Sequence, residues 1–96
     1  MEINNIVFQE FHLNLKNVNK NSNYSEQIRN YMTDKGYKYL ESNLCSNGMP
    51  TTIAIGGKLD KEHEKDFLTI TKQLGLCFKL GEIYNHMMPV RNNVNF

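Results

Sequence analysis

The chain has 96 residues, and its 11 Lys and Arg against 10 Asp and Glu leave a formal net charge of +1. This length suits a single domain with a modest core, and the near-balanced charge argues against a strong electrostatic attraction to nucleic acid or membranes. Hydrophobic residues make up 40% of the chain, which is enough for a packed core and argues against global disorder.

Residues 6–16 predict the first strand, because apolar and polar side chains alternate there with the period of two of a half-buried strand. Phe11, Leu13 and Leu15 form its apolar face, which Val7 continues. The polar, Asn-rich stretch that follows predicts a loop up to residue 23.

The first helix is predicted from Tyr24 to Lys35, where the apolar residues fall on one stripe. Asn23 is expected to cap its start in a capping-box pair with Glu26. Gly36 is expected to end it, since glycine readily adopts the left-handed conformation that closes helices.

Two strands of a hairpin are predicted next. Residues 37–44 are rich in aromatic side chains, and residues 51–57 alternate in polarity, with Ile53 and Ile55 on one face. A turn sequence at residues 46–48 lies between the two strands.

The second helix is predicted to begin after Asp60, its N-cap, and to close at Gly75. Phe67, Ile70 and Leu74 recur at helical spacing and form its expected buried stripe.

The last strand is predicted from residue 76 to about residue 86. Gly81 is expected to mark a β-bulge, because Ile83 continues the apolar pattern in the opposite phase. Pro89 is expected to end the regular structure, which gives one domain over residues 1–88 and a loose C-terminal tail over residues 89–96.

The predicted order is β-α-β-β-α-β, which is typical of a ferredoxin-like, two-layer α+β sandwich. We expect a four-stranded antiparallel sheet with both helices on one face, and right-handed crossovers predict the strand order 4-1-3-2. The expected core between sheet and helices is formed by Val7, Phe11, Leu13, Leu15, Ile28, Tyr31, Met32, Ile53, Ile55, Phe67, Ile70, Leu74, Phe78 and Leu80.

Two cysteines, Cys45 and Cys77, are expected at the same end of the sheet but on opposite edges. Three strand spacings separate these edges by roughly 14 Å, whereas the Cα atoms of a disulfide lie within about 7 Å. An intramolecular disulfide is therefore not expected. A reactive thiol is disfavoured too, because neither cysteine has an adjacent base or cation in the sequence.

The three histidines give weak signals for catalysis or metal binding. His63 and His86 are expected at the sheet end opposite the cysteines, which excludes a mixed Cys/His zinc site. With a neighbouring glutamate they could form a two-histidine, one-carboxylate site, although solvated surface histidines are favoured. His12 lacks the second histidine element that paired acid–base chemistry on a phosphoester needs. No catalytic residue, metal site or cofactor is predicted.

Two further ligand types are disfavoured. The Gly-Gly-Lys sequence at residues 56–58 precedes a helix, yet Leu59 stands where a phosphate-binding loop has Ser or Thr, and Asp60 would repel an anion. An open sheet of this type can bind RNA, but the third strand has no aromatic or basic residue, and Phe8 is the main central candidate for base stacking. An RNA-binding sheet platform stays as a further alternative.

The sheet face without helices is the expected contact surface, because an apolar centre with aromatic and charged groups resembles interface composition. Phe8 and Tyr84 are the expected anchors, since large aromatics usually dominate interface energy. A face-to-face homodimer is the favoured form and a foreign protein the second; a fold-back of the tail over this face is the alternative. The expected partner-binding residues are Phe8, Glu10, His12, Thr52, Ala54, Glu82 and Tyr84.

The sequence thus predicts a small, non-catalytic binding or regulatory protein that acts through protein–protein contact. Its many Asn and Lys residues indicate A/T-rich coding, which fits a phage, plasmid or low-GC bacterial accessory protein that modulates a host macromolecule. The chain lacks a signal-peptide pattern and an apolar run of the ~20 residues of a membrane span, so a cytoplasmic location is expected. The alternative function is a small phosphoester- or nucleotide-directed enzyme that uses His12 or the pair His63 and His86.

Overall fold

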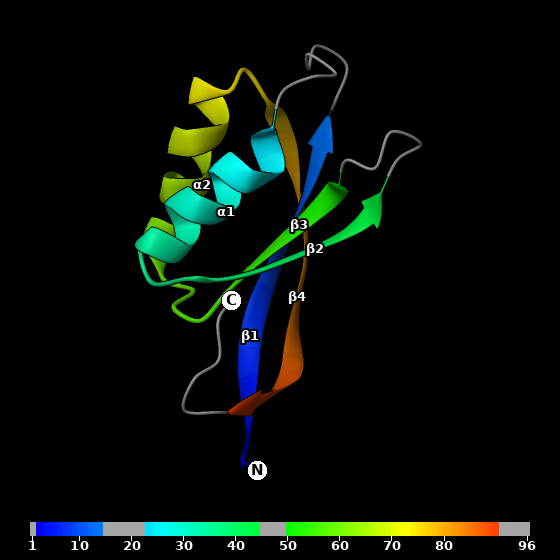
Figure 1. The fold of residues 1–96 in the computed structure, drawn as a ribbon, viewed down its shortest axis with the longest axis vertical. Coiled ribbons are helices and arrows are strands. Elements are labelled where there is room, and N and C mark those ends of the chain that lie inside the picture. The colour runs from blue at the N-terminus through cyan, green and yellow to red at the C-terminus, as the bar shows by residue number, and fades with distance from the viewer. Residues whose placement is uncertain (1, 15–22, 45–49, 91–96) are drawn as a thin grey trace.

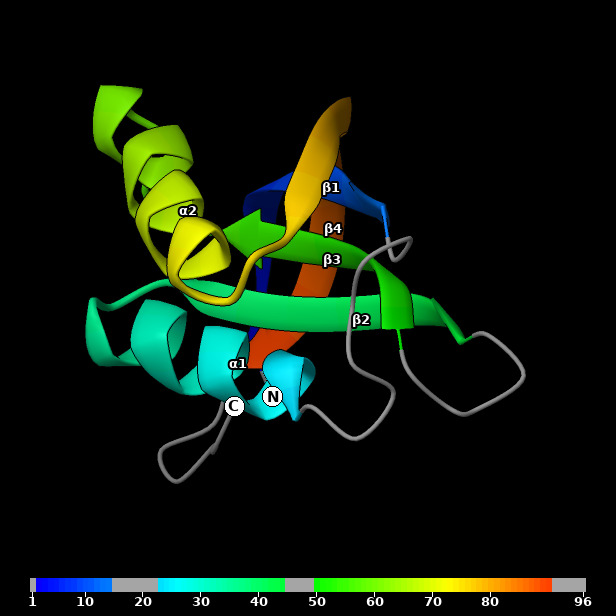
Figure 2. The same cartoon turned by 90° about the horizontal axis from the view of Figure 1, so that it is seen from above.

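The computed structural model describes residues 2–14, 23–44 and 50–90. The elements are β1 (Glu2–Asn14), α1 (Tyr24–Asp34), β2 (Lys38–Leu44), β3 (Pro50–Gly56), α2 (Lys61–Gln73) and β4 (Cys77–Val90). The strands form one antiparallel sheet in the order β2-β3-β1-β4, and both helices lie on the same side of it (Figures 1 and 2). This is the predicted ferredoxin-like sandwich, because 4-1-3-2 is the same order read from the other edge.

The helix ends follow the predicted signals, with one exception. The Asp60 side chain accepts a hydrogen bond from the Glu62 backbone N–H at 2.9 Å and so caps α2. Gly36 has the positive φ that follows a closed helix. Asn23 does not cap α1: its backbone is not extended as a capping residue requires, and its amide donates to the Glu26 carboxylate instead of accepting from the helix backbone.

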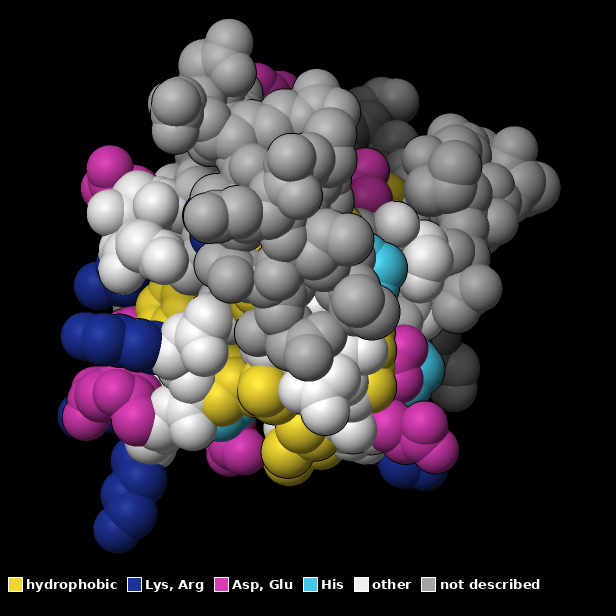
Figure 3. Space-filling model, turned by 90° about the horizontal axis from the view of Figure 1, so that it is seen from below, with side chains coloured by type: hydrophobic (Ala, Val, Ile, Leu, Met, Phe, Trp, Pro, Cys, Tyr) yellow, Lys and Arg dark blue, Asp and Glu magenta, His cyan; other side chains and the backbone are white. Residues whose placement is uncertain are grey.

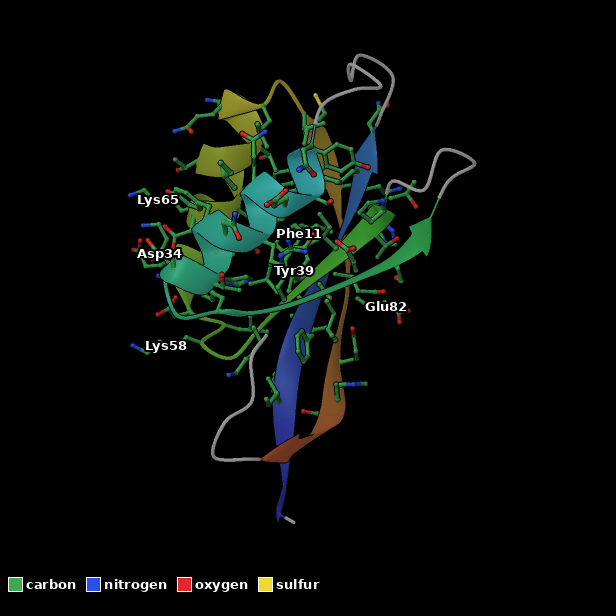
Figure 4. All side chains as sticks on the ribbon, in the orientation of Figure 1. Phe11, Asp34, Tyr39, Lys58, Lys65 and Glu82 are labelled. Atoms are coloured by element: carbon green, nitrogen blue, oxygen red, sulfur yellow. The ribbon has the colours of Figure 1, made fainter. Side chains whose placement is uncertain are left out.

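Aromatic stacking joins α2 to the sheet. The Phe11 ring of β1 lies on the Phe67 ring of α2 with 3.9 Å between centroids, and Phe78 of β4 meets both rings edge-on. Phe11 lies between sheet and helices, as predicted (Figure 4). The other buried members of this helix-side core are Leu13, Tyr24, Ile28, Met32, Tyr37, Tyr39, Ile53, Ile55, Ile70 and Leu76.

Buried tyrosines enter this core although they were not among the expected core residues. The Tyr37 hydroxyl donates to Asp66 Oδ2 at 2.8 Å, and the Tyr39 hydroxyl donates to Glu41 Oε2 at 2.8 Å. Burial raises the pKa of Tyr39, and the hydrogen bond to the Glu41 carboxylate raises it further. The rings can be buried because each hydroxyl keeps a partner.

β1 and β4 extend as a two-stranded ribbon beyond the rest of the sheet (Figure 1). β3 pairs with β1 only from Phe8 to His12, whereas the β1–β4 pairing continues to Glu2 opposite Val90. The expectation that Pro89 ends the regular structure is therefore wrong. An edge strand tolerates proline because its missing N–H need not break a ladder bond.

Two residues expected in the core are exposed. Val7 lies where β1 leaves β3, and Leu80 lies on the edge strand β4, so neither has a neighbouring strand on its outer side within the described sheet. Leu15 lies outside the described residues, as do the predicted loop at 17–22, the turn at 46–48 and the chain beyond Val90.

The predicted bulge is present in β4. Gln9 pairs with Ile83 and Phe11 with Leu80, so two residues of β4 lie opposite the single residue Glu10. The buried Gln9 amide donates to the Gly81 carbonyl at 2.9 Å and so satisfies a polar group that the bulge leaves there. A Cβ at Gly81 would lie 2.5 Å from His12 Nε2 and 2.9 Å from Glu10 Cβ, so a larger residue would require these side chains to shift.

Candidate functional site

The strand register brings the expected partner-binding residues together. Phe8, Glu10 and His12 alternate along β1 on the side away from the helices. Their partners across the ladders are Tyr84 of β4 for Phe8, and Ala54 and Thr52 of β3 for Glu10 and His12, with Glu82 beside them in the bulge. We call this surface the open sheet face.

The centre of the open sheet face is closed, which corrects the expectation that Phe8 is an accessible anchor. The Phe8 ring is fully buried and stacks on Tyr84 with 5.9 Å between centroids, while His86 meets it edge-on. The ring also covers Gly56, where a Cβ would lie 2.5 Å from it. Ala54 is buried with Phe8, and Ile6, Leu40 and Tyr84 pack partly buried against the pair.

Polar groups surround this centre and carry its accessible chemistry. His12 and Glu82 are exposed, while Glu10 and Tyr84 are half-buried. His12 Nδ1 lies 3.2 Å from the hydroxyl of Thr52, which is itself buried. Burial raises the pKa of Tyr84, and the nearby Glu10 carboxylate raises it further, so the phenol stays a neutral hydrogen-bonding group.

The structure separates the two histidines of the proposed metal or catalytic pair. His63 is buried on the helix side, where its ring meets Phe11 edge-on, whereas His86 lies against Phe8 on the open sheet face. The expectation of a surface position for His63 is therefore wrong. Its Nδ1 bonds to the Asp60 carbonyl, and its Nε2 has no hydrogen-bond partner among the described residues.

An open hollow of about 600 Å³ lies at one end of the sheet, lined by His12, Cys77 and Lys79 among others. Cys77 is an exposed free thiol, and Cys45 lies outside the described residues, so the expected absence of a disulfide between the two stays a prediction. The sequence analysis did not bring His12, Cys77 and Lys79 together. The two-residue spacing of Cys77 and Lys79 could have indicated part of this group, because it puts both side chains on one face of a strand.

The glycine-rich connection before α2 is used by the fold. The Gly57 N–H donates to the Val7 carbonyl at 3.1 Å, so this group is occupied within the chain and does not face an anion. Gly57 has φ +104°, a conformation that glycine adopts at low cost.

Four large apolar side chains of β1, α2 and β4 are exposed. Ile83 is 63% exposed, Leu80 47%, Leu68 43% and Val7 37%. Leu80 and Ile83 pair with Phe11 and Gln9 and so lie on the helix side of the sheet, on the edge strand of its described part. We call the four residues the β4 flank; Figure 3 shows hydrophobic side chains at the surface among charged ones.

Leu68 belongs to this flank because of its position around α2. Asp66 faces α1, since its carboxylate lies 3.8 Å from Lys35 Nζ and accepts from Tyr37. Leu68 follows two residues later, or about 200° around the helix axis, and so points away from α1. Because Phe67 and Phe78 seat α2 over β1 and β4, that side of the helix is the side of β4.

Comparisons of the chain with protein-family models, curated proteins and solved structures gave no match. Within residues 2–14, 23–44 and 50–90, no group of three His, Cys, Asp or Glu side chains could hold a metal ion. None of the helices in these ranges is long and apolar enough to cross a membrane.

Proposed function

We propose that this chain is a small, non-catalytic binding protein that acts through protein–protein contact at the β4 flank. The observation that carries the proposal is the exposure of Ile83 and Leu80 on an edge strand of a 96-residue chain. Burial of such a side chain is worth about 1.5–3 kcal/mol relative to exposure. Exposed apolar side chains that share one face mark interaction sites, and Val7, Leu80 and Ile83 share the helix side of the β1–β4 pair.

The free edge of β4 supports the same location. β4 borders only β1 in the described sheet, so the backbone groups on its outer side are open to pairing with another chain. Glu82 and Tyr84 lie on the other side of this edge, where Glu82 points away from the helices (Figure 4). A partner strand that pairs along β4 would thus contact the apolar side chains of the β4 flank on one side and Glu82 and Tyr84 on the other.

In this proposal the open sheet face makes the protein contact specific. Its exposed groups are polar or charged, and such groups select partners by complementarity more than they add affinity. The Asn- and Lys-rich composition supports the source class already named, an accessory protein of a phage, plasmid or low-GC bacterium that modulates a cytoplasmic host macromolecule. The partner in this proposal is a protein with an apolar patch of its own.

Substitution on β4 tests the proposal. Wild type, Ile83→Glu and the control Asn30→Glu on the exposed side of α1 serve as baits in a low-GC bacterial lysate, with quantitative mass spectrometry as the readout. We expect a protein that wild type and the control retain and that I83E retains at least about ten-fold less, a loss of about 1.4 kcal/mol. Equal capture by all three baits, with folding intact by circular dichroism, would contradict the proposal.

A small enzyme that acts on phosphoesters is the second candidate. The contact of His12 with Thr52 and the hollow that His12 shares with Lys79 favour it, because a histidine beside a cation could act on a bound anion. The buried Phe8 ring offers no surface for stacking RNA bases, and Phe8 was the main residue on which the RNA-binding alternative depended. Phosphoester hydrolysis that disappears in His12→Ala would establish the enzyme instead.

A further inference from the structure

The bulge at Gly81 changes which residues of β4 share a face. Before the bulge Leu80 lies on the helix side of the sheet, opposite Phe11, and after it Ile83 does so, opposite Gln9. Successive side chains on this face are therefore three residues apart, where a regular strand has them two apart. A straight partner strand that is in phase with β4 on one side of Gly81 is out of phase on the other, so the bulge protects this edge from ordinary strand pairing.

Leu80 and Ile83 also direct their backbone groups to the outer edge of the described sheet. The Gly57 N–H donates to the Val7 carbonyl, so the backbone groups of Val7 face away from β4. The second and fourth residues after Val7 face the same way, because backbone groups alternate in direction along a strand. These two residues lie opposite Ile83 and Leu80, which therefore turn their own N–H and C=O groups away from β1.

We propose that the partner strand at this edge is β4 of a second copy of the chain, antiparallel to the first, with Gly81 of each copy opposite Glu82 of the other. This proposal rests on the proposed function and names its partner. The second copy carries the same bulge, so with bulge opposite bulge the two strands stay in phase on both sides of it. Leu80 of each copy then pairs with Ile83 of the other, because a twofold interface repeats every contact in both directions.

This pairing matches side chains on both faces of the joined sheet. On the helix side, two Leu80–Ile83 pairs exchange backbone hydrogen bonds and bring four exposed apolar side chains together. On the open sheet face, Lys79 lies opposite Tyr84 of the second copy, with its Glu82 diagonally next. Neither Lys79 nor Glu82 forms an ion pair with another described residue. The two Glu82 carboxylates are the nearest like charges, and each lies between the Lys79 side chains of both copies.

Disulfide cross-linking tests this register, in a background in which Cys45 and Cys77 are replaced by serine. A Leu80→Cys protein is mixed with an Ile83→Cys protein and oxidised mildly, with non-reducing mass spectrometry as the readout. The proposed pair has Cα atoms about 5.5 Å apart, which suits a disulfide, whereas the two copies of position 80 are about 8 Å apart. We expect the mixed dimer in at least ten-fold excess over either symmetric one. Asp34→Cys on the exposed side of α1 is the control and should not cross-link to I83C (Figure 4).

Sedimentation velocity tests whether the dimer forms without a cross-link. We expect wild type to dimerise at about 100 µM, a concentration that populates a dimer with a micromolar Kd. Ile83→Pro removes an N–H that only the second copy uses and should weaken the dimer at least ten-fold, whereas Ile83→Val keeps that N–H and should stay within about two-fold of wild type. I83E serves in place of I83P if circular dichroism shows that the proline variant is unfolded. A wild-type monomer, equal cross-linking by all cysteine pairs, or an unweakened dimer of the folded variant would overturn the proposal.

The outcomes separate this proposal from the proposed function. If wild type stays monomeric while I83E loses a captured protein, the second copy is wrong and protein contact at the β4 flank stands. If the L80C and I83C proteins cross-link selectively while all baits capture the same proteins, the dimer stands and a foreign partner at β4 does not.

Discussion

Phe8 and Gly56 depend on each other on the open sheet face. The ring occupies the space of a side chain at Gly56, and Tyr84 closes it from the neighbouring strand. Gly56→Ala should therefore lower the free energy of unfolding by about 1–3 kcal/mol through overpacking. The double variant F8L/G56A should lose less than the sum of the two single variants, because the smaller side chain leaves room for the new methyl group. Urea unfolding measures all four proteins; strict additivity would contradict the contact.

The buried hydroxyl of Tyr39 links stability to high pH. Its pKa is raised above the ordinary value of 10.0, so the folded chain holds this proton more tightly than the unfolded chain does. The resulting stabilisation is complete below pH 10 and is lost as the pH rises above it, where the unfolded tyrosine ionises first. In urea unfolding between about pH 9 and pH 11, wild type should lose stability more steeply than Tyr39→Phe. If the free energy of unfolding falls equally with pH in both proteins, the Tyr39 proton does not contribute to stability.

At the scale of elements, the Phe67 side chain of α2 makes aromatic contacts with both β1 and β4. Phe67 stacks on Phe11 and meets Phe78, and it is fully buried. Phe67→Ala should lower the free energy of unfolding by about 3–5 kcal/mol, because it removes the ring and leaves a cavity between helix and sheet. Leu68→Ala, one residue on and exposed, is the matched control and should cost little. A loss under about 1 kcal/mol for F67A in thermal unfolding would contradict this assignment of the inward face.

β4 is the element in which local pattern and final environment differ most. Its alternation of Phe78 and Leu80 is that of a half-buried strand, yet Phe78 packs in the core and Leu80 does not. The Phe67 ring of α2 meets Phe78, whereas Leu80 stays exposed at the sheet edge. The bulge at Gly81 then brings Ile83 to the helix side as well, also uncovered. The I83E experiment tests whether this apolar surface, which no other described element covers, is a contact surface.

For the whole molecule, the sandwich has one complete core and one incomplete surface. The helix-side core lies between the helices and the middle of the sheet, while the ribbon of β1 and β4 extends beyond them (Figure 1). The open sheet face has its own small cluster around Phe8. The β4 flank between these regions is the part of the described chain where large apolar side chains meet solvent. Association through this flank would complete the burial that a 96-residue chain leaves unfinished.

The amino-acid sequence by itself determined the order and kind of the elements, the strand order and the membership of the open sheet face. These depend on local signals: the period of two along β1, the cap at Asp60, and the glycines at residues 36 and 81. The register followed because a strand with one buried face cannot slip by a single residue. Most of the helix-side core was predictable for the same reason.

The tertiary structure alone decided which apolar and polar side chains are covered. Phe8 is buried because Gly56 and Tyr84 lie beside it, and His63 is buried because α2 turns it towards Phe11. Leu80 alternates like a core residue but stays exposed at the edge of the sheet. Periodicity along the chain tells which face of an element a residue shares, but burial depends on which other elements reach that face, and that is settled only when the elements pack.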